Sequence, residues 1–310
     1  MRKLDTARSF WRIMRSISLS EIVKESRRSF AIAVVGHPDK RRAVLRALFP
    51  DMPDEAVHPL LRTFDSIAPE AGFPQESGSF DIVLDAGGGW VSTGVKVRLY
   101  SVIELGGWDA VVERVLDERP DLMLSLARRF PGLRPAVSER IIRETATANA
   151  QFAMLNALPG MLPLLGILIP TAVLGDLVFL SKNQALMLYR LAAAHDLPLD
   201  VSARAQDLAP LLGSAFGWRA LAREMVGFVP GGVGLVARGA VAYAGTYALG
   251  EAMRRFYAFG SRPTKALVAE VYRQSLGQAR QVASDVAKRL RSVKAPRGLL
   301  RGKDRRHGDG

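Results

Sequence analysis

A long stretch without charge is the strongest constraint on how this chain can fold. Residues 145–175 contain no Asp, Glu, Lys or Arg and include the apolar segment 152–175. A bilayer-spanning helix needs about 20 mostly apolar residues, so the length is sufficient. However, Pro159, Pro163 and Pro170 each remove a backbone donor and bend or end a helix. The stretch therefore predicts a bent or re-entrant segment, unless neighbouring helices satisfy the freed carbonyl groups of a full span.

A second apolar segment, residues 225–250, carries Arg238 as its only charge. Within it, Ala240, Ala244 and Ala248 recur every four residues, so they fall on one face of a helix. Small residues at this spacing let two helix backbones approach closely, as in membrane helix pairs. The same ladder also occurs in tight soluble bundles. It therefore predicts close helix packing in either environment.

Positive charge is concentrated at both ends of the chain. The net charge is +13; residues 251–310 hold 15 Lys and Arg against 5 Asp and Glu, and residues 1–29 hold 8 against 3. Basic ends on a nearly neutral body indicate a polyanionic partner, either anionic lipid or nucleic acid. Two membrane crossings, one for each apolar segment, would place both basic ends on the same side, and the positive-inside rule makes that side cytoplasmic.

The first third of the chain has the pattern of a small α/β layer. Three β-type runs rich in Val, Ile and Leu cover Phe30–Val35, Phe80–Asp85 and Val95–Val102. Helical patterns lie between and after them, at Lys40–Phe49 and Trp108–Leu116. Strands that alternate with helices indicate a layered arrangement, here with a thin sheet of three strands.

Strand signals stop near residue 119, and helical patterns fill the remainder. We therefore expect an α+β fold, with a small N-terminal α/β layer and a larger all-α domain that holds both apolar segments. The expected units are a basic amphipathic segment 1–29, the α/β domain 30–118, the helical domain 119–293 and a basic disordered tail 294–310. The expected helices are Asp121–Phe130, Pro135–Leu158, Thr171–His195, Val201–Phe216, Ala220–Met225, a long run to Phe259, and Thr264–Val293.

The first β-type run leads into a candidate phosphate-binding loop. Gly36 fills the first position of the motif G-x-x-x-x-G-K-[ST], but the last three positions fall on Arg41, Arg42 and Ala43. Arg41 hinders the tight turn that a second glycine allows. Arg42 keeps the charge of the motif lysine without its compact ammonium group, and Ala43 lacks the hydroxyl that holds Mg²⁺. In a nucleotide-binding protein, Lys40 or Arg42 would have to replace that lysine.

A second nucleotide-related element follows the second β-type run. Asp85 ends that run and Gly88 lies three residues later, which matches the D-x-x-G element of GTPases. In that element the Asp supports Mg²⁺ and the Gly senses the γ-phosphate. Asp followed by glycines is also ordinary turn chemistry, and the N-K-x-D element that reads guanine is absent. These residues favour a remnant that binds no nucleotide or binds an anion weakly; genuine hydrolysis and an unrelated α/β domain are the alternatives.

Other catalytic constellations are missing from the sequence. The chain has no cysteine, which excludes disulfides, thiolate zinc sites and a cysteine nucleophile. Its four histidines, at positions 37, 58, 195 and 307, have no metal-ligand spacing. We see no nucleophile elbow and no paired carboxylates in a defined context. We therefore expect a protein that is not an enzyme and holds no metal and no cofactor, with GTP as the one ligand left open.

The helical half resembles a known family. Residues 157–197, ALPGMLPLLGILIPTAVLGDLVFLSKNQALMLYRLAAAHDL, and residues 216–257, FGWRALAREMVGFVPGGVGLVARGAVAYAGTYALGEAMRRFY, carry the resemblance. They look like the helical domain of unknown function 697, the family of YcjF-type proteins, which follows Era-like GTPase domains in bacteria. The resemblance covers about residues 141–272. It implies a helical, membrane-associated module attached to a GTPase-like domain, and it implies no known activity.

The resemblance also singles out four polar residues beside the first apolar segment, Asp176, Lys182, Asn183 and Gln184. A carboxylate in an apolar neighbourhood must be paired or solvated. Asp176 is therefore expected either to pair with Lys182 or Arg190, or to cap the helix that follows it.

Together these patterns predict a non-catalytic, membrane-associated scaffold or regulator with a degenerate GTPase-like domain. The expected partners are the lipid bilayer, anionic lipid headgroups and a protein that the sequence does not name. The expected location is the bacterial inner membrane with both termini cytoplasmic; the alternative is a cytoplasmic protein with a buried helical hairpin. Two other functions stay open, an unorthodox nucleotide-binding GTPase-like protein and a soluble helical protein whose basic tail binds nucleic acid. The tail has no interleaved aromatic residues, which disfavours nucleic acid.

Overall fold

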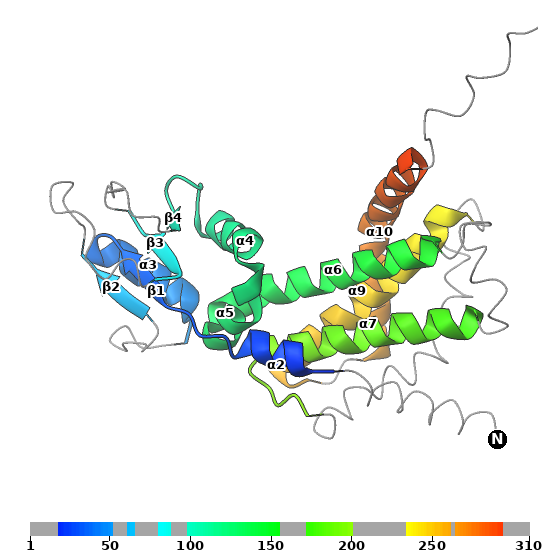
Figure 1. The fold of residues 1–310 in the computed structure, drawn as a ribbon, viewed down its shortest axis with the longest axis horizontal. Helices are drawn as coiled ribbons and strands as arrows, with labels where there is room; N and C mark the ends of the chain where they lie inside the picture. Colours follow the sequence, from blue (N-terminus) through cyan, green and yellow to red (C-terminus); the bar gives the residue numbers. More distant parts are fainter. Residues whose placement is uncertain are drawn as a thin grey trace, which may run out of the picture.

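A computed structural model of the chain describes residues 18–51, 61–65, 80–87, 98–155, 172–200, 234–261 and 264–293. A small parallel sheet lies at one end of the molecule and a set of long helices extends away from it (Figure 1). The expected mixture of a small α/β layer and a larger helical region is confirmed. The expected helices Val201–Phe216 and Ala220–Met225, most of segment 1–29 and all of segment 294–310 lie outside the described residues.

The sheet has four parallel strands: β1 (Ile32–Val35), β2 (Leu61–Phe64), β3 (Ile82–Asp85) and β4 (Leu99–Ser101). Their order is β2-β1-β3-β4, with β1 paired to β2 on one side and to β3 on the other. The sequence predicted three strands and missed β2. That strand, LRTF, exposes two of its four residues and lacks the continuous apolar run of β1 and β3.

One face of the sheet packs against helices. Helix α3 (Pro38–Leu48) follows β1, and α4 (Trp108–Glu118) follows β4. The short helix η2 (Pro120–Leu122), helix α5 (Met123–Arg129) and the short helix η3 (Pro131–Leu133) complete this cover. Because side chains alternate along a strand, even-numbered residues of β1 and β3 enter this core with Val111, Val115 and Leu116 of α4.

The long helices are α6 (Arg134–Leu155), α7 (Ala172–Ala194), α9 (Leu235–Phe259) and α10 (Lys265–Val293), and the short α2 (Ser20–Ser26) packs against α5 and α7. The predicted ladder of small residues on α9 is confirmed as a helix contact. Ala240, Ala244 and Ala248 are fully buried against α6 and α10. A Cβ atom added at Gly239 would lie 2.5 Å from Met154 Sδ and 3.1 Å from Ala283 Cβ, so these two side chains occupy the space that a larger residue would need.

The apolar core continues from the sheet into the long helices. Phe130, at the end of α5, contacts Phe30 with ring centroids 5.8 Å apart and Phe49 with centroids 5.2 Å apart. The same cluster reaches Leu249 and Met253 of α9. The two halves on either side of the proposed boundary at residue 118 therefore share buried surface.

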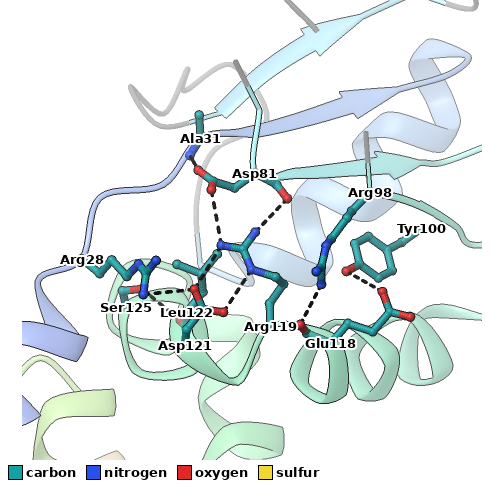
Figure 2. A network of polar contacts seen from close by, with 10 residues as sticks. All are labelled: Arg28, Ala31, Asp81, Arg98, Tyr100, Glu118, Arg119, Asp121, Leu122 and Ser125. Atoms are coloured by element: carbon teal, nitrogen blue, oxygen red, sulfur yellow. Dashed lines mark hydrogen bonds and ion pairs between the residues drawn. The ribbon is translucent and has the colours of Figure 1, made fainter. Parts of the chain in front are cut away.

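Polar contacts reinforce this junction (Figure 2). The Arg119 guanidinium donates to the Asp81 carbonyl (3.1 Å) and to Asp81 Oδ1 (3.3 Å), and also to both carboxylate oxygens of Asp121 (3.0 and 3.2 Å). Asp81 Oδ2 accepts the Ala31 N–H at 3.0 Å, and Arg28 pairs with Asp121 at 3.2 Å. One largely buried guanidinium therefore fixes the start of the sheet to the turn between α4 and α5.

Candidate functional site

The candidate phosphate loop is a turn of only two residues. Strand β1 ends at Val35 and α3 begins at Pro38, so Gly36 and His37 are the whole connection. The sequence predicted a helix over Lys40–Phe49, and the structure begins it two residues earlier, at Pro38, so positions 41–43 lie within α3. Pro38 explains the early start, because its fixed φ suits the first turn of a helix and its missing N–H is not needed there.

The amide groups of this turn point at protein backbone. The Gly36 N–H donates to the Phe64 carbonyl at 3.3 Å, and the His37 N–H donates to the Gly87 carbonyl at 3.2 Å. A phosphate-binding loop works by aiming such N–H groups at the ligand. These two donors are already used in joining the ends of β1, β2 and β3.

The need for glycine at position 36 follows from this closure. Gly36 has a φ of +137°, and a Cβ atom there would lie 2.8 Å from the Gly87 carbonyl oxygen. Gly87 itself has a φ of +115°, and its own Cβ would lie 2.9 Å from Ile103 Cδ1. The glycine that the motif assigned to phosphate binding therefore permits close contact between two chain turns.

The basic side chains of α3 are held by neighbouring groups. Arg41 Nη1 donates to the Gly36 carbonyl at 3.1 Å and pairs with Asp65 at 2.6 Å. Arg42 forms an ion pair with Asp39, and this contact holds the pKa of the Asp39 carboxyl below its usual value. Lys40 is exposed, and its Cγ lies beside Gly87.

Asp85 ends β3 beside this turn and is only 7% exposed. Its Oδ1 accepts the Gly87 N–H at 2.8 Å, the contact of an Asx turn. Gly88 lies outside the described residues. The structure therefore brings together Gly36, Asp85 and the backbone of α3 at one edge of the sheet. These residues lie at the carboxyl ends of the central strands β1 and β3, where the strand order reverses. Doubly wound sheets bind their ligands at such a switch point.

A second polar cluster lies between the long helices and includes two of the predicted residues. Asn183 Nδ2 donates to Asn149 Oδ1 at 2.9 Å, and Asn149 Nδ2 donates to Thr246 Oγ1 at 2.9 Å. Gln184 Nε2 also donates to Thr246 Oγ1, at 3.3 Å. We call these four residues, from α6, α7 and α9, the polar layer.

The sequence identified Asn183 and Gln184 but missed Asn149 and Thr246. A signal was available, because Asn149 is an amide inside the charge-free run 145–175, and Thr246 is a hydroxyl inside the second apolar segment. Buried polar groups in such surroundings need partners. The sequence could show that partners were needed but not which ones were within reach.

The other two polar residues predicted from the resemblance, Lys182 and Asp176, are not part of the polar layer. Lys182 is exposed. Asp176 is the fifth residue of α7, which begins at Ala172, so the prediction that Asp176 caps a helix is wrong. Its side chain lies outside the described part of the structure, so its pairing stays a prediction. Arg190 contacts Glu25 of α2 at 3.7 Å. Burial raises the pKa of Glu25, and Arg190 opposes that rise.

Contacts between the long helices define their register. Ser138 and His195 lie 3.3 Å apart near the sheet, and the polar layer joins the helices midway. Farther out, Gly239 lies against Met154 and Ala283. Leu155, Ala172 and Leu235 therefore mark one end of the bundle, away from the sheet, which we call the distal end (Figure 1).

Charge is divided unevenly across the polar layer. Between the layer and the distal end, α6, α7 and α9 carry three charged residues, Asp176, Lys182 and Arg238. On the side toward the sheet they carry nine: Arg134, Glu139, Arg140, Arg143, Glu144, Arg190, Glu251, Arg254 and Arg255. Residues 156–171 and 225–233, which complete the two apolar segments, adjoin the distal end in the sequence and lie outside the described residues.

No described helix is long and apolar enough to cross a membrane. Within the part of the chain that the structure describes, no cluster of His, Asp or Glu side chains is placed to hold a metal ion. Comparison with protein-family models, curated proteins and solved structures found no match.

Proposed function

We propose that this protein is a non-catalytic, membrane-associated scaffold or regulator, with a GTPase-like remnant at one end and a lipid-facing bundle end at the other. The observation that carries the proposal is that three helices end or begin at the distal end within the apolar segments of the sequence. Helix α6 ends there and α7 begins there, both within the apolar segment 152–175, and α9 begins there within the apolar segment 225–250. The sheet lies at the opposite end (Figure 1).

The chemistry of the sheet edge supports a non-catalytic role. Phosphoryl transfer needs free N–H donors, a mobile cation and a Mg²⁺ ligand around the phosphates. Here the Gly36 and His37 amides bond to backbone, and Arg41 pairs with Asp65. Asp85 is engaged by the Gly87 N–H. In this proposal the GTPase-like domain positions the long helices and provides a surface that binds another protein.

Fractionation of the full-length protein tests the membrane association. Membranes are washed in high salt, then in alkaline carbonate, and then in detergent. We expect the protein to stay in the pellet through high salt, because apolar surface and charge both contribute to binding. Complete release by salt would show that the basic ends alone are the anchor, and a protein that never pellets would overturn the proposal.

A second candidate, nucleotide binding at the sheet edge, is favoured by one observation. The strand order β2-β1-β3-β4 places a switch point between β1 and β3, where such sheets bind ligands. A thermal-shift measurement with Mg²⁺ and GTP or ATP separates the two, because a ligand at 100 times its Kd stabilises a protein by about 2.7 kcal/mol. We expect no shift; a shift that depends on nucleotide concentration would favour the second candidate.

A further inference from the structure

The charged outer face of α10 lies alongside the distal end. Gly239 of α9 packs against Ala283, and Leu235 packs in the same cluster as Val286 and Ala287. The segment of α10 from residue 280 to 289 is therefore level with the last turn of α6 and the first turns of α9. Its apolar face is buried against those helices. Its outer face exposes Arg280, Lys288 and Arg289, and Lys288 forms an ion pair with the half-exposed Asp285 at 3.3 Å.

This placement limits how deeply the bundle can enter a bilayer. Charged side chains are costly in the hydrocarbon core, and α10 carries its cations along the distal half of the bundle. The same cations suit the headgroup layer, where each Lys or Arg near an anionic surface contributes about 1 kcal/mol of binding. The described helices therefore fit outside the hydrocarbon, with the end of α10 at the headgroups.

The length of chain between α6 and α7 limits the topology further. Asn149 and Asn183 share a hydrogen bond, so the two helices lie side by side and the chain between them must return to the side it left. Only residues 156–171 separate Leu155 from Ala172. A chain that crosses the hydrocarbon core as a single segment must be helical. At about 1.5 Å per residue, these 16 residues span roughly 24 Å, less than half of the roughly 60 Å needed to cross a 30 Å core twice.

From these observations we infer that the distal end docks onto an anionic bilayer from one side, with Lys288 and Arg289 of α10 at the headgroups and no crossing of the membrane. This inference rests on the proposed membrane association and specifies its lipid class and geometry. It replaces the sequence-based expectation of one crossing for each apolar segment, because the helices on either side of segment 152–175 belong to one bundle.

Vesicle binding of the full-length protein tests the lipid class. The double variant Lys288→Gln/Arg289→Gln is compared with Lys265→Gln/Arg273→Gln, which removes the same two charges near the other end of α10. On vesicles of phosphatidylcholine with about 30% phosphatidylglycerol, we expect the first variant to bind about thirtyfold more weakly, since two cations contribute about fivefold each. The control is expected to bind like the native protein, and circular dichroism verifies the folding of both.

Probes attached to single cysteines test the geometry, because the chain has no cysteine of its own. A bimane probe at Leu155→Cys should be quenched by lipid with a spin label on its headgroup, and one at Ser261→Cys, at the opposite end of α9, should not. In native membrane vesicles, Ser29→Cys and Asp200→Cys should react with an impermeant maleimide from the same side. The expected one-crossing topology would place them on opposite sides.

The outcomes separate the two levels of the proposal. If no vesicle binds the native protein, the membrane association itself fails. If the protein binds but both double variants bind equally, or quenching appears at position 261 instead of 155, the docking surface is wrong. Reaction of Ser29→Cys and Asp200→Cys from opposite sides would show that the chain crosses the membrane.

Discussion

Removing one hydroxyl from the polar layer should weaken the helical bundle measurably. Thr246 Oγ1 accepts hydrogen bonds from Asn149 Nδ2 at 2.9 Å and from Gln184 Nε2 at 3.3 Å. The substitution Thr246→Val keeps the shape of the side chain and removes this acceptor. Asn149 is fully buried, so its donor cannot turn to water.

The expected magnitude follows from the groups left without a partner. A buried donor without an acceptor costs about 1–3 kcal/mol. Asn149 should contribute most of this, while Gln184 is only partly buried and can be solvated in part. We therefore expect Thr246→Val to lower the free energy of unfolding by about 2 kcal/mol. Urea unfolding followed by circular dichroism at 222 nm measures it, with the linear slope checked for a change.

A matched control comes from the neighbouring helix. Thr145 Oγ1 donates to the Ile141 carbonyl at 2.8 Å, an acceptor that keeps its helical partner after Thr145→Val. That variant should change stability by less than about 0.5 kcal/mol. The double variant Asn149→Leu/Thr246→Val should lose about 1 kcal/mol less than the sum of its single variants, because donor and acceptor leave together. Equal effects of the two threonine substitutions, or strict additivity in the double variant, would refute the reasoning.

Three further predictions concern packing, the junction and pH. Gly239→Ala should destabilise the protein by about 1–3 kcal/mol, because the new Cβ would lie 2.5 Å from Met154 Sδ. In contrast, a Cβ at Gly277 of α10 meets nothing within 4 Å, so Gly277→Ala should stabilise the protein by about 0.5–1 kcal/mol. Thermal unfolding of both variants measures the two effects. Arg119→Lys should lower the melting temperature despite the conserved charge, because one ammonium cannot reproduce the forked contacts of the guanidinium in Figure 2, and an unchanged melting temperature would contradict that role. Burial, with Arg134 and Arg254 nearby, lowers the pKa of His195 from 6.5 to about 4. As the pH falls, the imidazole of His195 therefore takes up its proton in the unfolded chain before it does so in the folded protein. The free energy of unfolding should fall by about 3 kcal/mol as the pH drops from 6.5 to 4. The loss over the same pH range should be smaller in His195→Gln.

Local patterns in the sequence were sufficient for most elements of the fold. The runs at β1 and β3, the helical periodicity of α3, α4, α6 and α10, and the ladder of Ala240, Ala244 and Ala248 predicted elements that the structure contains. These signals succeed because burial of one face dictates which residue types recur at each period. Strand β2 was missed because its burial depends on β1 beside it and not on its own composition.

The candidate site shows where local patterns are insufficient. The sequence singled out Gly36 and Asp85 separately, as parts of two nucleotide-related motifs. The structure places them together, since the carboxyl ends of parallel strands share one edge. Their chemistry was decided by tertiary contacts: the Phe64 and Gly87 carbonyls take the amide donors that a phosphate would need. No spacing of residues in the sequence shows which carbonyl occupies a given donor.

The sequence by itself determined that this chain has a small sheet, long helices, two apolar segments and basic ends, because composition and periodicity fix what each segment must bury or expose. Only the tertiary structure decided that Asn149, Asn183 and Thr246 form one layer and that α6 and α7 lie side by side. The physical reason is that hydrogen-bond partners and helix register depend on residues distant in sequence. The same register places the end of α6 and the start of α7 at one end of the bundle.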